Sequence, residues 1–561
     1  MEAFHQVMLM LAEQIIQRNG NEDNMRPGIL FLACTILILS SCGFQRDLDT
    51  ISEVQKPNED TLLTAVSSEL SEFETTIPFV AEETETDATL ESAVTLPASS
   101  VDEHNGLEQS EGQNTQPVNE KGCFLKHSLG KFHSAALTED NRLYTWGNNG
   151  GGQLGFESTS SDLWGDAFTG IPTLVPTLSG VKDVWLGYNK SMASTSNGDF
   201  FVWGGGWHMI LGLDGIDDGH SPIMMPNLKN VVDVAMEFHY SAAVTSDGDL
   251  YTWGLNSYGQ LGYVSTSSIE ITDQILPFTP LPTRVPGVCN VVSVSLGANH
   301  IAALTSNGDL YTWGSDYSGQ LGHDYTTTDS LGYPYTCTPA KIPGLENVTA
   351  VSSGGSVTAA ICENGDLYTW GENYYGQLGY PSVEITDMGQ PYTSVPTKVP
   401  GLSNVIAVAL SGSHCAAITA AGDLYTWGSN SSGELGHGDM RGRRSPTKVT
   451  GLTNVISISL EPYFSAAITA DGDLYTWGAN NRGQLGHESS ESDSIGYPCT
   501  FSPTRVTGLS NVLSVSFGGV HGAAITADGH IYTWGGNMNG QLGDGTMENR
   551  SLPVKIKIKE E

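Results

Sequence analysis

Apolar and polar residues alternate over short stretches of this chain, and one such stretch returns along most of its length. Its clearest copy is Asp473-Leu474-Tyr475-Thr476-Trp477-Gly478. The other seven copies end at Trp146, Trp203, Trp253, Trp313, Trp370, Trp427 and Trp534, each followed by glycine. Neighbouring copies are 50 to 60 residues apart. Alternation with a period of two indicates β-strands, and a repeat of this length is typical of a β-propeller.

One repeat is expected to form four short antiparallel strands, which make one propeller blade. In the seventh copy they are Val455–Leu460, Ser465–Thr469, Leu474–Trp477 and a strand that begins at Pro503. An Asp-Gly turn joins the second strand to the third, because glycine accepts the positive φ of a tight hairpin. The motif Gly-Gln-Leu-Gly and a loop of variable length separate the third strand from the fourth.

Eight such units can be counted, which predicts an all-β, closed propeller over residues 121–561. The second unit is degenerate: Phe201–Gly204 persists, but Ile210-Leu211-Gly212 replaces Gly-Gln-Leu-Gly. Its spacing is regular on both sides, so we count eight blades, or seven if this unit is absorbed by a neighbour. An open array would expose strand edges, so we expect Leu552–Ile558 to pair into the blade begun by Phe124–Thr145.

The chain before the repeats divides into three segments. Residues 1–24 are an N-terminal extension or a mis-assigned start. Residues 25–42 have the form of a secretory signal, with Arg26, an apolar run over Gly28–Leu39 and small residues before Cys42. Leu39-Ser40-Ser41-Cys42 resembles the bacterial lipobox, in which the cysteine is lipidated; the alternative is a buried core segment. We interpret residues 25–42 as a lipoprotein-type signal peptide.

Residues 43–120 form an acidic linker. Between Gln45 and Glu120 there are 18 acidic residues and two basic ones, Arg46 and Lys56. Such a tract cannot bury enough apolar surface to offset its ordering entropy, so we expect a disordered spacer. The formal net charge of the whole chain is -38, which disfavours nucleic acid as a partner. Eight cysteines without a C-x-x-C pair indicate neither a zinc site nor a readable disulfide framework.

The repeat motifs resemble those of the regulator of chromosome condensation family. The resemblance rests on Tyr-Thr-Trp-Gly with Gly-Gln-Leu-Gly, on Gly130–Ala136 (Gly-x-x-His-Ser-Ala-Ala) and on Pro396–Val399 (Pro-Thr-Lys-Val). It covers Gly122 to the C-terminus and implies a propeller, usually of seven blades. The best-known member of the family is an exchange factor for the small GTPase Ran on chromatin. The resemblance would therefore imply guanine-nucleotide exchange and a cytoplasmic or nuclear protein.

Catalytic and cofactor-binding motifs are missing from the sequence. It contains no H-E-x-x-H, G-x-S-x-G or Walker motif. Gly150–Gly155 matches G-x-G-x-x-G, but a Ser/Thr loop follows instead of a helix, which argues against dinucleotide binding. We therefore expect no enzyme, no cofactor and no metal ligands.

Histidine recurs at one position of the repeat. His133, His300, His414 and His521 occupy it in four units, and Lys190, Tyr240, Val357 and Phe464 in the others. A ring of imidazoles could hold a metal. A position that also accepts Phe and Val is better explained by structure, with each imidazole hydrogen-bonded to a neighbouring blade. The repeated tryptophans are likewise expected to pack between blades.

Five long inserts follow the Gly-Gln-Leu-Gly position. They are Phe156–Ile171, Tyr263–Leu281, His323–Thr338, Tyr380–Val395 and His487–Ser502. They leave each repeat at the same point and should therefore emerge on one face. The aromatic residues that they offer as binding candidates are Trp164, Tyr325, Tyr333, Tyr335, Tyr392 and Tyr497. Aromatic loops on a rigid scaffold suit recognition, although loops of variable length also serve as plain connections.

The sequence thus favours a non-catalytic scaffold that binds a protein or another envelope macromolecule through one propeller face. It would be monomeric, anchored outside the cytoplasm by lipid on Cys42 and otherwise free of the membrane. A cytoplasmic exchange factor for a small GTPase is the main alternative, by family resemblance. A glycan-binding or glycan-acting envelope protein is a further one.

Lipid attachment at Cys42 is directly testable. Labelled palmitate should enter the wild-type protein and not Cys42→Ala, because the thiol is the only acceptor that the motif provides. Equal incorporation in both proteins, or unprocessed protein recovered from the cytosol, would rule out the anchor.

Overall fold

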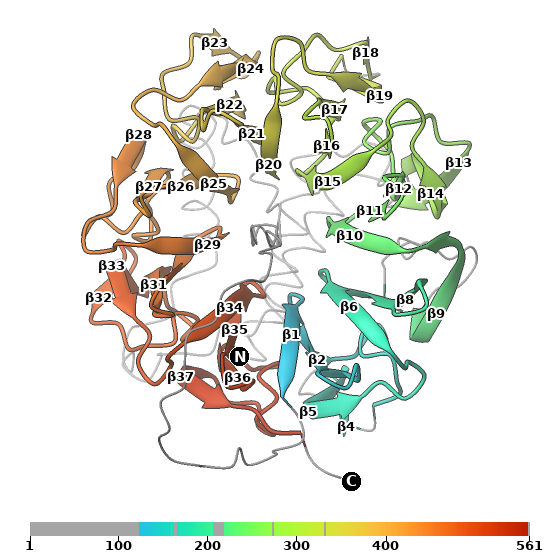
Figure 1. Cartoon of the computed structure of the whole chain (residues 1–561), viewed down its shortest axis with the longest axis vertical. Helices are drawn as coiled ribbons and strands as arrows, with labels where there is room; N and C mark the ends of the chain where they lie inside the picture. Colours follow the sequence, from blue (N-terminus) through green and yellow to red (C-terminus); the bar gives the residue numbers. More distant parts are fainter. Residues whose placement is uncertain are drawn as a thin grey trace, which may run out of the picture. The chain divides into compact units, whose positions relative to one another are not determined.

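The computed structural model describes residues 123–158, 160–161, 165–205, 218–271, 274–329 and 332–558. The predicted signal, Cys42 and the linker lie outside the described residues. Eight antiparallel sheets stand in a ring around an axis, one sheet for each repeat, as Figure 1 shows. The degenerate second unit forms a sheet of its own, so the count of eight blades is confirmed. Within these ranges no helix is long and apolar enough to cross a membrane.

Every blade is one continuous piece of chain, and its strands run in order from the axis outward (Figure 1). The innermost strands are β1 (Phe124–Leu129), β6 (Val181–Leu186), β10 (Val231–Met236), β15 (Val291–Leu296), β20 (Val348–Gly354), β25 (Val405–Leu410), β29 (Val455–Glu461) and β34 (Val512–Phe517). The second strands are β2 (His133–Thr138), β7 (Lys190–Thr195), β11 (Tyr240–Thr245), β16 (His300–Thr305), β21 (Val357–Cys362), β26 (His414–Thr419), β30 (Phe464–Thr469) and β35 (His521–Thr526).

The third and fourth strands complete each blade. The third strands are β3 (Leu143–Asn148), β8 (Asp199–Gly205), β12 (Leu250–Leu255), β17 (Leu310–Ser315), β22 (Leu367–Glu372), β27 (Leu424–Gly428), β31 (Leu474–Ala479) and β36 (Ile531–Gly535). The fourth strands are β5 (Ala167–Leu174), β9 (Asp218–Lys229), β14 (Gln274–Arg284), β19 (Pro334–Lys341), β24 (Pro391–Lys398), β28 (Arg443–Lys448), β33 (Pro498–Arg505) and β37 (Arg550–Lys555).

Five blades carry a fifth strand that the sequence did not predict. These strands are β4 (Ser160–Ser161), β13 (Ser267–Ile271), β18 (Thr327–Thr328), β23 (Glu384–Ile385) and β32 (Glu491–Ser492). They belong to the five blades with long inserts, and each pairs with the fourth strand of its blade. The fourth strand also begins earlier than expected, at Pro498 instead of Pro503 in the seventh blade. The described parts of each long insert therefore pair as two antiparallel strands, which satisfy each other's backbone hydrogen bonds.

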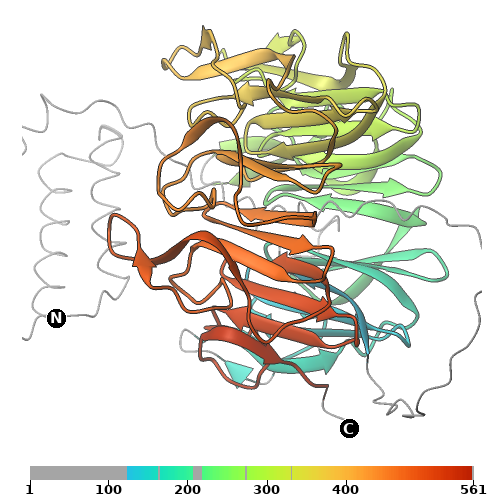
Figure 2. The ribbon, with the colours of Figure 1, turned by 60° about the vertical axis from the view of Figure 1, so that its left-hand side comes forward.

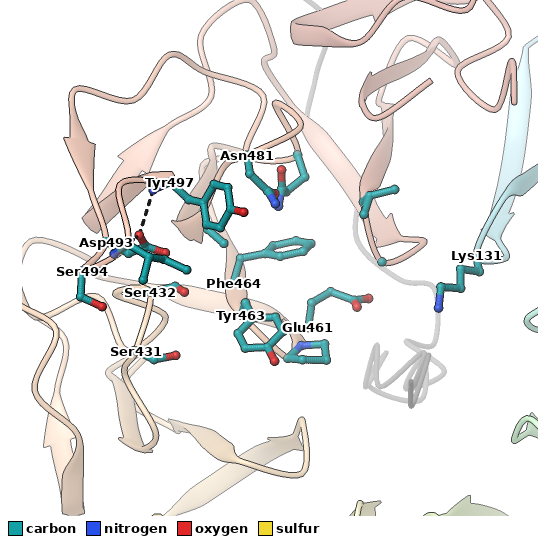
Figure 3. Close-up of a pocket in the computed structure, with 16 residues that line it drawn as sticks. Lys131, Ser431, Ser432, Glu461, Tyr463, Phe464, Asn481, Asp493, Ser494 and Tyr497 are labelled. Atoms are coloured by element: carbon teal, nitrogen blue, oxygen red, sulfur yellow. Dashed lines mark hydrogen bonds between the residues drawn. The ribbon is translucent and has the colours of Figure 1, made fainter. Parts of the chain in front are cut away.

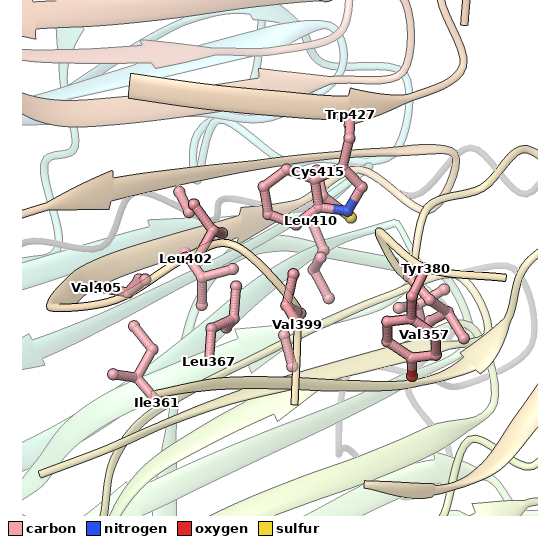
Figure 4. Close-up of a cluster of buried hydrophobic side chains, with 14 residues drawn as sticks. Val357, Ile361, Leu367, Tyr380, Val399, Leu402, Val405, Leu410, Cys415 and Trp427 are labelled. Carbon is pink, nitrogen blue, oxygen red and sulfur yellow. The ribbon is translucent and has the colours of Figure 1, made fainter. Parts of the chain in front are cut away.

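The apolar core lies between neighbouring sheets. Figure 4 shows one such layer, where Leu367 and Val399 of the fifth blade meet Leu410 and Trp427 of the sixth. All six side chains of each second strand are buried, since this strand has a sheet on both sides. Small residues such as Ala416 and Ala417 let the sheets approach closely, and the tryptophan fills the remaining space. Packing between blades is the role predicted for the tryptophans.

A hydrogen-bond relay connects adjacent blades at the same place in the repeat. Trp203 Nε1 donates to the backbone oxygen of Gln153 in the preceding blade, at 3.0 Å. Ser191 Oγ donates to the same oxygen at 2.7 Å, and His133 Nε2 lies 3.0 Å from Ser191 Oγ. Because the serine proton is already engaged, His133 donates and Ser191 accepts. Seven of the eight tryptophans make this bond within the described residues.

The four histidines thus have the structural role that the sequence predicted. The other three Nε2 atoms lie 2.8 to 3.1 Å from a hydroxyl of the next blade, and the histidines are His300, His414 and His521. Burial lowers the pKa of these imidazoles to between about 3 and about 4. They are neutral at physiological pH, which suits donors that face a hydroxyl in an apolar layer.

Lys190 takes the histidine position in the degenerate second blade. Its ammonium donates to the backbone oxygen of Glu237 at 2.7 Å and to Ser241 Oγ at 3.2 Å, both in the third blade. Burial lowers the pKa of Lys190 to about 7 and raises that of Glu237 to about 8, while each group opposes the other's shift. The position again makes a bond between blades, now with a different donor.

The ring does not close in the way that the sequence suggested. β37 pairs with β36 of its own blade, with Thr533 opposite Val554, and not with the first blade. Each repeat already holds all four of its strands, so no strand remains for exchange between the ends. Figure 1 and Figure 2 show the last blade, in red, beside the first blade, which begins in blue. The expected strand clasp is therefore wrong.

Side-chain packing and single backbone hydrogen bonds, such as that from Phe124 N to the Gly529 oxygen at 2.8 Å, close the ring instead. Phe124, Trp146, Ile531 and Ile556 share one buried cluster that joins the last blade to the first. The relay is present here as well, because Trp146 Nε1 donates to the backbone oxygen of Gln541 at 2.9 Å. The closing junction is thus equivalent to the other junctions.

Removal of β37 tests how much the last strand supports this junction. Truncation after Asn549 should lower the melting temperature by several degrees, because it leaves β36 as an open edge and removes Ile556 from the closing cluster. Removal of residues 559–561 alone is the matched control and should leave melting unchanged. Equal melting of both truncated proteins, measured by calorimetry, would contradict the account.

Candidate functional site

The inserts and the inner loops lie on one face of the propeller, which we call the insert face. One pocket shows this directly, since it is lined by Tyr463 from a first-to-second strand loop, by Asn481 from the turn after a third strand and by Tyr497 from an insert. The antiparallel order of the strands places these three loop types at the same end of every blade. The hairpins between second and third strands lie at the other end, on the opposite face.

Tyrosines gather where the fourth and fifth blades meet on the insert face. The ring of Tyr333 packs edge-to-face on that of Tyr317, with centroids 5.1 Å apart. Burial raises the pKa of Tyr392, and the charges of Glu384, Asp316 and Asp387 add to the rise, as does the neighbouring Tyr325. Candidates from two separate inserts therefore share one surface.

The candidate binding residues differ in how exposed they are and in which blade they lie. Tyr325 is 52% exposed, whereas Tyr333, Tyr335 and Tyr392 are half-buried. Tyr335 lies inside β19, opposite Thr327 of β18. Tyr497 is well exposed but lies on the seventh blade, apart from the others. Trp164 lies outside the described residues.

Further aromatic residues of this face were missed from the sequence. Tyr317, Tyr374 and Tyr375 occupy the tight turn before Gly-Gln-Leu-Gly, and Tyr374 is 50% exposed. Tyr374 and Tyr375 pack edge-to-face on each other, with centroids 4.8 Å apart. These positions vary between repeats more than the flanking motif does. That contrast is the signal from which they could have been found.

A second aromatic group lies nearer the axis, in the loops between first and second strands. Phe132, Tyr188 and Phe238 come from three successive blades and pack edge-to-face, at 5.9 and 4.7 Å. Lys131 Nζ lies 4.5 Å from the centroid of the Tyr188 ring. The seventh blade adds the exposed Tyr463 at the same loop. The fourth, fifth and sixth blades have small residues there, at Ala298, Gly355 and Gly412.

The charge of the inserts has one sign. The five long inserts together hold 12 Asp and Glu residues and no Lys or Arg. The short loop of the sixth blade differs, because it carries Arg441, Arg443 and Arg444. Arg443 is paired with Asp439 at 2.9 Å. The surface that the long inserts present is therefore acidic and rich in tyrosine.

A hollow lies on this face between the sixth, seventh and eighth blades. It has a volume of about 490 Å³. Figure 3 shows Tyr463, Phe464 and Tyr497 along it, with Glu461 near the axis and Asp493 in the insert. Over the described ranges no group of three or more His, Cys, Asp or Glu residues is arranged to hold a metal ion. The aromatic side chains and separate carboxylates that line the hollow suit the binding of a ligand.

Asp316 is an exception within the turn that carries Tyr317. Other described blades have asparagine there, and Asn373 is typical: its Oδ1 accepts from Leu378 N and its Nδ2 donates to the Tyr380 backbone oxygen at 2.7 Å. Asp316 Oδ1 accepts from Leu321 N at 3.0 Å, but a carboxylate has no proton to donate. Burial raises the pKa of Asp316 to about 7, and Asp324 adds to the rise.

Comparisons with known proteins agree with this geometry. A family model described as an RCC1-like domain matches residues 272–561. Models of the regulator of chromosome condensation (RCC1) repeat match residues 124–153, 231–260 and 140–194. The chain belongs to the RCC1-like family. Its relatives include the ultraviolet-B receptor UVR8 of Arabidopsis thaliana, which is 31% identical over 439 residues; the match covers 77% of this chain and 69% of UVR8.

Other RCC1-like proteins match over shorter parts. Protein pim1 of Schizosaccharomyces pombe is 30% identical over 330 residues, which cover 56% of this chain and 60% of that protein. The match thus spans less than two thirds of pim1. Yeast RCC1 (Prp20), solved with Kap60 bound, has a TM-score of 0.51 and 24% identity; the match covers 64% of this chain and 84% of that one. The similarity to the yeast RCC1 structure shows a shared fold.

Replacement of Asp316 by asparagine should stabilise the protein in a pH-dependent way. The carboxyl has its ordinary pKa, near 3.8, in the unfolded chain and about 7 in the fold. Stability is therefore lost as pH rises from about 4 through about 7, because the folded state must ionise a buried group. Asp316→Asn should gain about 1–3 kcal/mol at pH 8 and nothing near pH 4. A gain of equal size at both pH values, in urea unfolding, would refute this assignment.

Proposed function

We propose that this protein is a non-catalytic scaffold that binds another protein through its insert face. The observation that carries the proposal is the group of exposed tyrosines on the fourth and fifth blades, presented by hairpins and tight turns. Tyrosine offers a large contact area with few rotatable bonds, so it loses little entropy on binding. Aromatic residues on a rigid frame are what the centre of an interface requires.

The contrast between frame and loops supports this proposal. The repeated tryptophans, histidines and Gly-Gln-Leu-Gly motifs are buried between blades. Their role is packing, and they are not accessible to a partner. The residues that differ from blade to blade are the exposed ones, such as Tyr325 and Tyr374. Yeast RCC1, a protein that shares this fold, was solved with the protein Kap60 bound to it.

We further propose that the propeller is held outside the cytoplasm by lipid on Cys42, with the acidic linker as a spacer. Its partner would then be a protein or another macromolecule of the envelope. Membership of the RCC1-like family supports a second candidate function, that of a cytoplasmic exchange factor for a small GTPase. The two differ in one measurement, because only an exchange factor would speed release of labelled GDP from a GTPase that it binds.

Point substitutions on the insert face test the scaffold proposal. We avoid shortening the inserts, because their second halves form β19 and β24. A partner is first captured by the wild type from the cell envelope and identified, and its dissociation constant is then measured. The double variant Tyr325→Ser, Tyr374→Ser should bind at least about tenfold more weakly, since both rings leave the interface.

Val292→Ser is the matched control. Val292 is an exposed apolar residue near the start of β15, at the end of the blade that lies away from the inserts. This variant should bind as the wild type does, and all variants should melt at the same temperature. Full affinity in the tyrosine variant would contradict the role of these tyrosines, and a loss confined to Val292→Ser would place the binding surface on the opposite face.

A further inference from the structure

We propose that the pocket between the sixth, seventh and eighth blades receives an arginine side chain of the partner protein. The proposal deepens the function proposed above and rests on it, because it names the chemistry that one part of the insert face would recognise. The pocket is the hollow of about 490 Å³ lined by Glu461, Tyr463, Phe464, Asp493 and Tyr497.

Two tyrosines that flank the fourth-blade insert, Tyr258 and Tyr317, are replaced beside the seventh-blade insert by Ser432 and Asn481, which line the hollow. The fourth and seventh blades carry almost the same insert turn, Asp329-Ser-Leu-Gly-Tyr333 and Asp493-Ser-Ile-Gly-Tyr497. In the fourth blade the ring of Tyr317 packs on that of Tyr333. The equivalent residue of the seventh blade is Asn481, which lines the pocket. The space that Tyr317 fills in one blade is thus left for a ligand in the other.

The pocket is built as a rigid site. Phe464 is 2% exposed and is held edge-to-face by Phe517 of the next blade, with centroids 4.9 Å apart. Asp493 Oδ1 accepts hydrogen bonds from the backbone N–H groups of Ile495 and Tyr497, at 3.0 and 2.9 Å. The turn therefore fixes Tyr497 above the hollow, as Figure 3 shows.

Two carboxylates flank the aromatic walls. Glu461 ends β29 on the axial side and is only 4% exposed, while Asp493 lies in the outer insert. Lys131 stands across from Glu461 at the axial edge (Figure 3). Two acidic groups against one basic group favour a cation, and the insert of this blade adds Glu488 and Glu491 without any Lys or Arg. A basic residue of the partner is thus complementary in charge.

The shape and chemistry favour arginine among cations. A planar guanidinium stacks on tyrosine faces and can bond to carboxylates in the same plane, which a compact ammonium cannot do. The aliphatic stem would lie against Phe464, Ile495 and Val520, which supply apolar lining. The volume lies within the range of roughly 300–1,000 Å³ that small-ligand sites have. It accommodates one long side chain and the backbone on either side.

Small probes test the pocket without knowledge of the partner. The probes are acetyl-arginine methylamide, acetyl-lysine methylamide and acetyl-citrulline methylamide, since citrulline keeps the shape of arginine without its charge. The full-length protein carries 3-fluorotyrosine at Tyr463 or Tyr497, and fluorine NMR follows each titration. The arginine probe should give a saturable shift at both positions, and the citrulline probe should bind at least about tenfold more weakly.

Variants then locate the site. Asn481→Tyr copies the fourth blade and should abolish the shift by filling the hollow, while the fold is kept. Asp493→Asn preserves the acceptor that holds the turn but removes the charge, so it should weaken the arginine probe several-fold. Asp329→Asn is the matched control, because Asp329 Oδ1 accepts from Tyr333 N in the equivalent turn; it should change nothing.

Three results would overturn the proposal: equal affinity for arginine and citrulline probes, undiminished shifts in Asn481→Tyr, or no saturable shift at Tyr463 and Tyr497. Tighter binding of the lysine probe would refute the choice of arginine. Each of these results can be distinguished from a result that contradicts the scaffold proposal. If the probes fail while a partner still depends on Tyr325 and Tyr374, the insert face binds without this pocket.

Discussion

In seven of the eight blades, within the described residues, a buried tryptophan donates to one backbone carbonyl of the neighbouring blade, and this bond joins the two blades. The carbonyl of Gln153 accepts the indole N–H of Trp203 and the hydroxyl proton of Ser191, and that hydroxyl accepts from His133. All of these bonds cross from one blade to the next in a layer without solvent. A buried carbonyl that lost them would remain unsatisfied, at a cost of about 1–3 kcal/mol. The tryptophan and the Gly-Gln-Leu-Gly turn of the preceding blade therefore recur together, and at four junctions a hydroxyl also donates to the same carbonyl.

The same relay explains how the ring closes. His521, Ser134, Gln541 and Trp146 make the identical set of bonds between the last blade and the first. Closure needs no exchanged strand, because the terminal repeats are chemically complete. An open strand edge is unfavourable, as expected from the sequence, but strand pairing between the terminal repeats is not needed to cover it. Side-chain packing and the relay cover it instead.

The propeller frame could be predicted because its motifs recur in every repeat. The candidate binding site could not be predicted in full, because its residues differ from one repeat to the next. Eight blades, the roles of the tryptophans and the hydrogen bonds of the histidines followed from comparing one repeat with the next. The fifth strands were missed because they depend on pairing within an insert, as between Glu491 and Cys499, and no period marks them. Tyr317 and Tyr374 were not predicted because they lie outside the long inserts, at variable positions of the tight turn before Gly-Gln-Leu-Gly.

Because the frame is constant and the exposed loops vary, we infer that the insert face recognises the partner. Hydrogen–deuterium exchange of the full-length protein, alone and with its identified partner, tests this claim most directly. The account predicts slower exchange on binding in the inserts and turns around Tyr325, Tyr374 and Tyr497, with the hairpins at Asp247–Asp249 and Asp471–Asp473 unchanged. Protection of those hairpins, with the inserts unaffected, would contradict it.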